Sequence, residues 1–182
     1  MITYTTFPSP FGRLGIARTQ KGLCRLSFPE KTPQLPTYLR TQFPGETILK
    51  DNHGLQSAID QLKAYFAGER KTFDLVLDLR LPPFYKKVLE EVRKIPYGTT
   101  ASYKDIAQRL KNPLAVRAVG SANARNPLPI IIPCHRVVGH NGGLGGYGGR
   151  LDRKVILLEL EGAPLPWHGK PNFNKPRMKT FN

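Results

Sequence analysis

Cysteine and long apolar runs are both scarce in this chain of 182 residues. The two cysteines, Cys24 and Cys134, lie far apart in the sequence and do not indicate a disulfide framework, and no C-x-x-C or clustered Cys/His spacing indicates zinc. No apolar segment approaches the roughly 20 residues that a transmembrane helix needs. The first residues lack a basic segment followed by an apolar one, so we expect no secretory signal. These absences favour a protein of the reducing cytoplasm, with no membrane segment and no bound metal.

Acidic side chains are also few: 13 Asp and Glu stand against 28 Lys and Arg, and the formal net charge is +15. The excess is uneven, because residues 1–80 carry a net +4 and residues 81–182 carry +11. Such a charge favours a polyanionic partner for the second half. Nucleic acid is favoured over an anionic membrane, because no basic amphipathic helix is evident. The alternative is a protein that is simply basic, and charge alone does not name a partner.

Residues 1–80 have the pattern of a small α/β domain. Short strands separated by Pro/Gly turns are predicted over residues 2–6, 14–18 and 23–28, which gives an antiparallel meander. Apolar residues at helical spacing predict a helix over residues 54–67, and alternation predicts a further strand over residues 73–79. Cys24 falls in a predicted strand and is interpreted as a packing residue.

Residues 81–165 change character and read as a second, mainly helical domain, followed by a basic tail over residues 166–182. Ser102 and Asp105 have the spacing of a capping box, which predicts a helix to about Leu110. Asn112 and Pro113 predict a further helix to about Ala124, and the pair has the helix-turn-helix pattern. Its second helix has few groups that read base edges apart from Arg117, so sequence-independent DNA binding is favoured. An ordinary helical hairpin with a solvated arginine is the alternative.

The stretch Ile130–Val138 places a thiol, an imidazole and a guanidinium inside a short apolar run. His135 can take the proton of Cys134, and Arg136 supplies positive charge, which are the surroundings that favour a thiolate. Pro133 stiffens the turn before the thiol. Cys134 is therefore a candidate nucleophile. The alternative is a core cysteine beside a hydrogen-bonded histidine.

Two features downstream bear on the same chemistry. A glycine-rich loop follows the histidine, and its formal G-x-G-x-x-G pattern is not a dinucleotide site, because it belongs to no visible βαβ unit. Such a loop instead lets the backbone approach a flat ligand. Glu161, at the end of a predicted final helix over residues 151–160, could orient a histidine as a carboxylate does in catalytic triads.

Together these segments resemble the O6-alkylguanine-DNA alkyltransferases. The resemblance is carried by Arg117-Ala118-Val119-Gly120, by Asn126-Pro127-Leu128-Pro129-Ile130, by Ile132-Pro133-Cys134-His135-Arg136-Val137-Val138 and by the Gly/Tyr loop, over about residues 82–162. It implies a small antiparallel sheet with a helix, ribonuclease-H-like, in residues 1–80, and a winged helix-turn-helix in residues 81–165. It further implies direct reversal of guanine O6 alkylation, in which the alkyl group passes irreversibly to the cysteine and the protein acts once.

The resemblance assigns roles to the reacting residues. Cys134 attacks the alkyl carbon, while His135, through a water, removes the thiol proton and Glu161 holds the imidazole. A base inside a duplex must leave the stack before a buried thiol can reach it. Arg117 is implied to fill the vacated space, and Tyr103 to press on the adjacent phosphate and to protonate the leaving guanine.

Further residues are assigned in the same way. Asn126 is implied to brace the active-site turn and Lys154 to assist at the oxygen. The DNA-contacting residues are implied to be Arg117, Tyr103, Ala118, Ser121 and Arg136. The pocket around the base is implied to be lined by Pro129, Val137, Tyr147, Gly148 and Gly149. No cofactor is implied, and the expected partner is double-stranded DNA carrying O6-alkylguanine, bound by a monomer without sequence specificity. O4-alkylthymine stays open as a second substrate, and nucleoid association, or a nuclear location in a eukaryote, would follow DNA binding.

Two other function classes remain. A non-catalytic lesion binder would keep the helix-turn-helix and the arginine but would lack the nucleophile, and the presence of Cys134 disfavours it. A Cys-His hydrolase would need an oxyanion hole and would turn over repeatedly. A reaction that stops after one product per protein chain would exclude the hydrolase.

Overall fold

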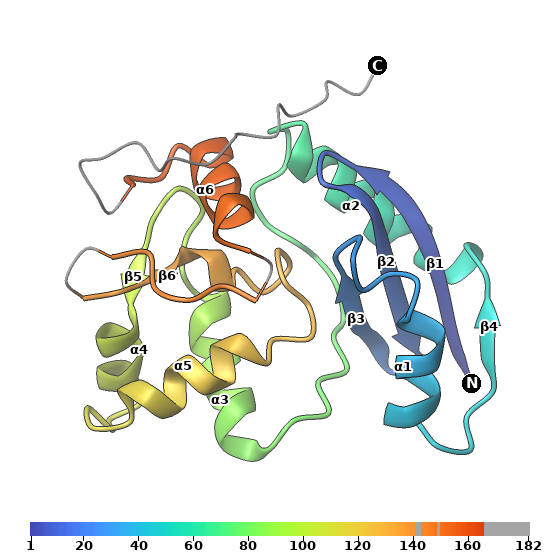
Figure 1. Cartoon of the computed structure of the whole chain (residues 1–182), viewed down its shortest axis with the longest axis horizontal. Coiled ribbons are helices and arrows are strands. Elements are labelled where there is room, and N and C mark those ends of the chain that lie inside the picture. The colour runs from blue at the N-terminus through green and yellow to red at the C-terminus, as the bar shows by residue number, and fades with distance from the viewer. Residues whose placement is uncertain (141–142, 149, 166–182) are drawn as a thin grey trace. The chain divides into compact units, whose positions relative to one another are not determined.

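The computed structural model describes residues 1–140, 143–148 and 150–165. Contacts divide the described chain into two compact units, with the boundary between Arg80 and Leu81 (Figure 1). The basic tail expected over residues 166–182 lies outside the described residues. Within the part of the chain that is described, no helix has both the length and the apolar character needed to cross a membrane.

The first unit is built on a four-stranded sheet with the strand order β3-β2-β1-β4 (Figure 1). Strands β1 (Ile2–Ser9), β2 (Gly12–Thr19) and β3 (Gly22–Ser27) form the predicted antiparallel meander. A fourth strand, β4 (Ile48–Lys50), pairs with β1 in parallel, so the sheet is mixed and the expectation of an antiparallel sheet was wrong in this respect. Helix α1 (Leu35–Gln42) lies in the connection from β3 to β4, and a strand that returns in parallel needs such a crossover.

Cys24 lies on β3 inside the core of the first unit. It packs in a cluster of buried side chains, whose other members are Ile2, Ala17, Leu35, Leu39 and Phe43. Burial is the main cause that raises the pKa of the Cys24 thiol to about 12. A thiol this difficult to ionise is inert at neutral pH, in keeping with a packing role.

The helix expected over residues 54–67 forms as a 3-10 turn, η1 (His53–Leu55), followed by α2 (Gln56–Phe66). The strand expected over residues 73–79 does not form, and only Leu77 makes a bridge, to Leu23. At this bridge the Leu23 amide donates to the Val76 carbonyl at 2.8 Å, and the Asp78 amide donates to the Leu23 carbonyl at 2.7 Å. Earlier in the segment α2 holds the chain: the Asp74 amide donates to Gln61 Oε1 at 2.9 Å, and Gln61 Nε2 donates to the Asp74 carbonyl at 3.1 Å.

The second unit is mainly helical. Its elements are α3 (Pro83–Arg93), β5 (Ala101–Ser102), α4 (Tyr103–Arg109), α5 (Val116–Ala124), η2 (Cys134–Arg136), β6 (Val137–Val138) and α6 (Leu151–Leu160). The capping box is present, because the Asp105 amide donates to Ser102 Oγ at 3.0 Å and the Ser102 amide donates to Asp105 Oδ2 at 2.7 Å. Both α3 and α4 pack against α5, and β5 pairs in parallel with β6.

Helix α5 begins later than the sequence predicted. The Ala115 amide donates to the Asn112 carbonyl at 3.0 Å, which closes a turn over residues 112–115. The first bond into the helix runs from the Val119 amide to the Ala115 carbonyl at 2.8 Å. Pro113 therefore stands in the turn between α4 and α5 rather than at the first position of the helix, and the turn of the helix-turn-helix is longer than expected.

Candidate active site and nucleic-acid interface

The thiol is presented by a short, buried turn. Residues 130–138 are all buried, and Cys134 is 4% exposed. The Cys134 amide donates to the Ile132 carbonyl at 2.8 Å and closes an inverse γ-turn at Pro133. The Arg136 amide donates to the Pro133 carbonyl at 2.9 Å, which is the bond of the 3-10 turn η2. Ile130 precedes this turn with a φ of 76°, a value that β-branched residues rarely adopt. Core packing holds the strained backbone in place, as is common at functional sites.

Asn126 ties this turn to the end of α5. Its Nδ2 donates to the Ile132 carbonyl at 2.8 Å, and its Oδ1 accepts from the Leu128 amide at 3.0 Å. Both ends of the side-chain amide are thus used on the backbone immediately before the thiol. This is the geometry that a bracing role requires.

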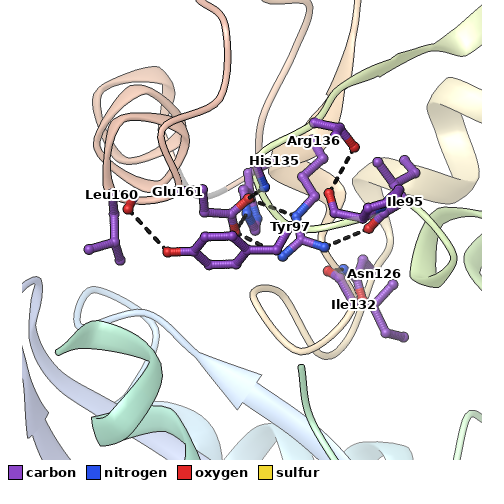
Figure 2. Close-up of polar contacts among 11 residues, drawn as sticks. Ile95, Tyr97, Asn126, Ile132, His135, Arg136, Leu160 and Glu161 are labelled. Atoms are coloured by element: carbon purple, nitrogen blue, oxygen red, sulfur yellow. Dashed lines mark hydrogen bonds and ion pairs between the residues drawn. The ribbon is translucent and has the colours of Figure 1, made fainter. Parts of the chain in front are cut away.

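Glu161 joins His135 and Arg136 into one buried network (Figure 2). Its Oε1 lies 2.8 Å from His135 Nε2, and Arg136 donates to both carboxylate oxygens, from Nε at 2.8 Å and from Nη2 at 2.9 Å. Burial raises the pKa of the Glu161 carboxyl, but the hydrogen bonds from His135 and Arg136 outweigh it, and the pKa falls to about 2. Glu161 is therefore a carboxylate at any physiological pH.

Arg136 does not stand where the resemblance placed it. Its side chain is 6% exposed, and its remaining Nη1 donates to the Ile95 carbonyl at 2.6 Å. All three guanidinium nitrogens donate to Glu161 or to the backbone, so Arg136 cannot offer a pair of N–H groups to a phosphate. Its assignment as a DNA contact is therefore wrong for this structure. The Arg136 guanidinium contacts Glu161, whereas the sequence analysis expected its positive charge to lie beside the Cys134 thiol. Arg136 is a structural cation that holds the carboxylate in place.

The loop after α3 completes the support around this network, a contribution that the sequence analysis missed. Tyr97 donates its hydroxyl to the Leu160 carbonyl at 3.1 Å, and its ring centroid lies 5.7 Å from the Arg136 guanidinium carbon (Figure 2). The Gly98 amide donates to Glu161 Oε2 at 3.3 Å. The sequence Pro96-Tyr97-Gly98 is typical of a turn, but a local pattern does not indicate a partner 63 residues away.

Lys154 supplies the positive charge that the sequence analysis assigned to Arg136. It is fully buried on α6, and its Nζ donates to the Val137 carbonyl at 2.6 Å and to the Leu144 carbonyl. Burial lowers the pKa of Lys154 to about 8, and the nearby Cys134 partly opposes that fall. A large fraction of this amine is protonated at neutral pH, and its charge stabilises a developing thiolate.

The pKa values of the Cys134 thiol and the His135 imidazole shift in opposite directions. Burial raises the pKa of Cys134, while hydrogen bonds from Asn126 and Tyr147 and the charge of Lys154 favour its thiolate. Burial lowers the pKa of His135, although Glu161 works against that shift. The result is a neutral thiol beside a neutral imidazole, a pair that ionises when the proton is removed during the reaction.

Tyr103 stands at the first turn of α4 against the glycine-rich loop. Its hydroxyl donates to the Gly146 carbonyl at 3.2 Å. Gly145 has a φ of 66°, and a Cβ there would lie 2.8 Å from the Tyr103 ring, so only glycine fits. Burial raises the pKa of Tyr103, and the hydroxyl therefore keeps its proton at neutral pH. It is able to donate that proton to a leaving group.

The outer face of α5 carries the residues expected to meet DNA. Arg117, Ala118 and Ser121 are all exposed on this helix. Sequence analysis missed Arg125, which is exposed at the end of α5 and donates from Nη1 to the Tyr85 hydroxyl, with its guanidinium carbon 5.4 Å from the Tyr85 ring centroid. An arginine at each end, with small side chains between, suits a helix that approaches a backbone closely.

The residues expected to line the pocket differ in how deeply they are buried. Pro129 is half-buried and pairs with Ile132 beside the active-site turn, Val137 is fully buried, and Gly148 is exposed in the loop. Tyr147 lies near Cys134, and burial raises the pKa of Tyr147 well above its usual value. Gly149 lies outside the described residues. Among the residues that the structure describes, no group of three or more His, Cys, Asp or Glu side chains could hold a metal ion.

Comparison with known proteins matches both units. Residues 2–79 match the model of the 6-O-methylguanine DNA methyltransferase ribonuclease-like domain, and residues 83–163 match that of the 6-O-methylguanine DNA methyltransferase DNA binding domain. The predicted fold class is thereby confirmed, apart from the mixed sheet.

Full-length relatives agree. The methylated-DNA--protein-cysteine methyltransferase of Mycobacterium bovis is 45% identical over 166 residues, covering 91% of this chain and 96% of that protein. The constitutive one of Bacillus subtilis is 44% identical over 161 residues, covering 87% and 94%. The crystal structure of Mycobacterium tuberculosis OGT in complex with DNA superposes with a TM-score of 0.77 at 43% identity, covering 90% of this chain and 96% of that one. With relatives this similar along most of its length, the chain belongs to the methylated-DNA--protein-cysteine methyltransferase family.

Proposed function

We propose that this protein repairs DNA by direct reversal, moving the alkyl group from O6 of guanine to Sγ of Cys134. A carbon–sulfur bond forms as the carbon–O6 bond breaks, the thiol proton leaves through His135, and the departing guanine takes up a proton. The observation that carries the proposal is the chain of buried contacts that links the turn bearing Cys134 and His135 to Glu161 inside the DNA-binding unit.

The proton path follows from the hydrogen bonds of the imidazole. With hydrogen on Nε2, His135 donates to Glu161, and its basic nitrogen is then Nδ1, which takes the thiol proton directly or through a water. Glu161 remains charged and stabilises the imidazolium that forms. Tyr103 keeps its hydroxyl proton and supplies it to the leaving guanine. Because a thioether is a poor leaving group, each chain acts once.

The binding partner is double-stranded DNA carrying the lesion, recognised without regard to the surrounding sequence. Within α5 itself, Val116–Ala124, Arg117 is the one exposed long polar side chain that could read a base edge, and a single probe does not specify a sequence. Arg117 instead occupies the space that is left in the base stack when the damaged base is flipped toward Cys134. The chain supplies every group named in this mechanism, so it acts as a monomer. Its place of action is the cytoplasm, on the nucleoid when DNA is bound, or the nucleus in a eukaryote.

Intact-protein mass spectrometry tests the proposal. The protein is mixed with an excess of duplex carrying O6-methylguanine, and the mass gain should stop at one methyl group per chain, with peptide mapping placing it on Cys134. Tight binding to the lesion without any gain would support a lesion binder instead. Repeated release of product from an unmodified protein would support a hydrolase.

Arg117→Ala tests the flipping role. Extruding a base costs a few kcal/mol, and an intercalated side chain offsets part of that cost. We expect single-turnover transfer from duplex DNA to slow by roughly tenfold or more, while transfer from a single-stranded oligonucleotide changes much less. Rapid-quench measurements on both substrates check this. Equal slowing on both substrates would assign Arg117 to general DNA affinity.

Arg125→Ala tests the second arginine of α5. Its contact with Tyr85 restrains the side chain in advance, so little freedom is lost on meeting a phosphate. We expect binding to weaken similarly for all sequences, and the slope of log affinity against log salt to fall by about one. Fluorescence anisotropy at several salt concentrations measures both quantities, with Arg13→Ala in the first unit as the matched control. An unchanged slope would remove Arg125 from the interface.

A further inference from the structure

The turn between α4 and α5 presents an apolar side chain to solvent. Leu114 is 94% exposed, more than any other large apolar side chain that the structure describes, and Val76 follows at 73%. Partly exposed leucines are common on protein surfaces, but a leucine this exposed makes almost no contact with its own chain and is not held in place by packing. The proposed alkyl transfer gives this side chain no role.

The backbone around Leu114 is fixed by hydrogen bonds. The Asn112 amide donates to the Ala107 carbonyl at 3.0 Å, which fastens the turn to the end of α4, and the Asn112 carbonyl accepts from the Ala115 amide. Pro113 fixes its own φ inside the turn. A side chain on such a preformed turn loses little freedom when it meets a partner.

The usual intramolecular use of an apolar residue at this position is absent. Ala115 is the N-cap of α5, and an apolar side chain directly before the cap often packs on the fourth residue of the helix. That fourth residue is Val119, which is fully buried. Leu114 is too exposed to rest on it. A partner outside the chain is therefore the remaining use of its apolar surface.

The charge around the turn identifies the class of partner. Residues 106–130 contain no acidic side chain, and all their cationic side chains are exposed: Arg109, Lys111, Arg117 and Arg125. A partner for this surface has to combine negative charge with apolar groups. A DNA strand does so, because its phosphates alternate with deoxyribose rings whose C–H groups are apolar. Apolar side chains are indeed used by other proteins to contact duplex DNA.

We propose that Leu114 packs against deoxyribose rings of the bound duplex and contributes an apolar part of the DNA affinity beside the cations. This inference rests on the proposed function and adds a contact of a different chemical kind to it.

An apolar contact and an ion pair respond differently to salt. Each phosphate that a cation neutralises releases counterions, so the contribution of that cation to affinity falls as the salt concentration rises. Burying apolar surface releases no counterions, and the contribution of Leu114 should therefore be the same at every salt concentration. Partial burial of one leucine side chain corresponds to roughly fivefold to tenfold in Kd.

Fluorescence anisotropy at several salt concentrations tests the proposal, with a duplex that carries no lesion so that no transfer occurs. Leu114→Ser should bind roughly fivefold to tenfold more weakly throughout, which gives a parallel line in a plot of log affinity against log salt. Leu114→Met keeps the apolar area and should bind as the unmodified protein does. Leu114→Lys should steepen the slope by about one and bind more weakly than the unmodified protein at the highest salt.

Val76→Ser in the first unit is the matched control, because it also removes a highly exposed apolar side chain, and it should bind as the unmodified protein does. Neither serine substitution removes core packing, so both variants should fold normally.

A Leu114→Ser line that coincides with that of the unmodified protein would overturn the proposal and would favour a protein partner for this turn. A Leu114→Lys line that lies above the unmodified protein at every salt concentration would also overturn it, as would an equal loss of affinity in Val76→Ser. Failure of the unmodified protein to bind any duplex would instead refute the DNA partner of the proposed function.

Discussion

Cys134→Ala is expected to abolish alkyl transfer completely while leaving binding to lesion-bearing duplex intact. The sulfur is the atom that forms the new bond, and no neighbouring group can replace it, because Tyr147 and Tyr103 both have a raised pKa and keep their protons. The change removes one buried atom, so the turn held by Asn126 should persist. Intact-protein mass spectrometry after incubation with O6-methylguanine duplex checks transfer, and anisotropy checks binding.

The second cysteine supplies the matched control for this experiment. Cys24 is equally buried, but it lies in the first unit, and burial raises the pKa of its thiol to about 12. Cys24→Ala should therefore accept one methyl group per chain at the rate of the unmodified protein. Methylation that survives in Cys134→Ala and disappears in Cys24→Ala would move the nucleophile to the first unit and end the proposed mechanism.

Glu161→Gln is expected to have the largest effect on stability. The substitution keeps the shape of the side chain but leaves Arg136 buried without its counter-ion. Removing one member of a buried ion pair typically costs about 3–5 kcal/mol of unfolding free energy. Transfer should also slow by roughly a hundredfold, because the imidazolium of His135 loses its stabilising charge. Urea unfolding at neutral pH and single-turnover rates measure the two effects.

The stability loss should depend on pH in a defined direction. The folded-state pKa of Glu161 is about 2, below the ordinary 4.5, so its contribution is present above pH 4.5 and is lost as the pH falls toward 2. The shift corresponds to about 3 kcal/mol. The difference between the unmodified protein and Glu161→Gln should therefore shrink across this acid range. Glu159→Gln, an exposed neighbour on α6, is the control, and a Glu161→Gln variant as stable as that control at pH 7 would contradict the expectation.

Local chemistry explains which features could be predicted. The capping box of Ser102 and Asp105 acts over three residues, and the meander of β1 to β3 depends on short turns, so the sequence contained both. The start of α5 was misjudged because Asn112 and Pro113 suit a turn as well as a helix start, and the backbone bond of Ala115 decided between them. Strand β4 was missed because three residues, two of them exposed, carry no periodic signal of their own, and only pairing with β1 makes them a strand.

In the active site, too, some features could be predicted from local sequence and others depended on tertiary packing. The sequence alone indicated a candidate nucleophile and an adjacent candidate base, because Cys134 and His135 are neighbours within one apolar run. The role of Glu161 came from the resemblance, and the structure brings its carboxylate to 2.8 Å from His135. The tertiary structure decided which cation serves which group. His135 and Arg136 both reach the Glu161 carboxylate, and Arg136 and Glu161 are 25 residues apart in the sequence, so only packing brings them together. Because Arg136 is bound there, Lys154, brought in by the packing of α6, supplies the charge near the thiol.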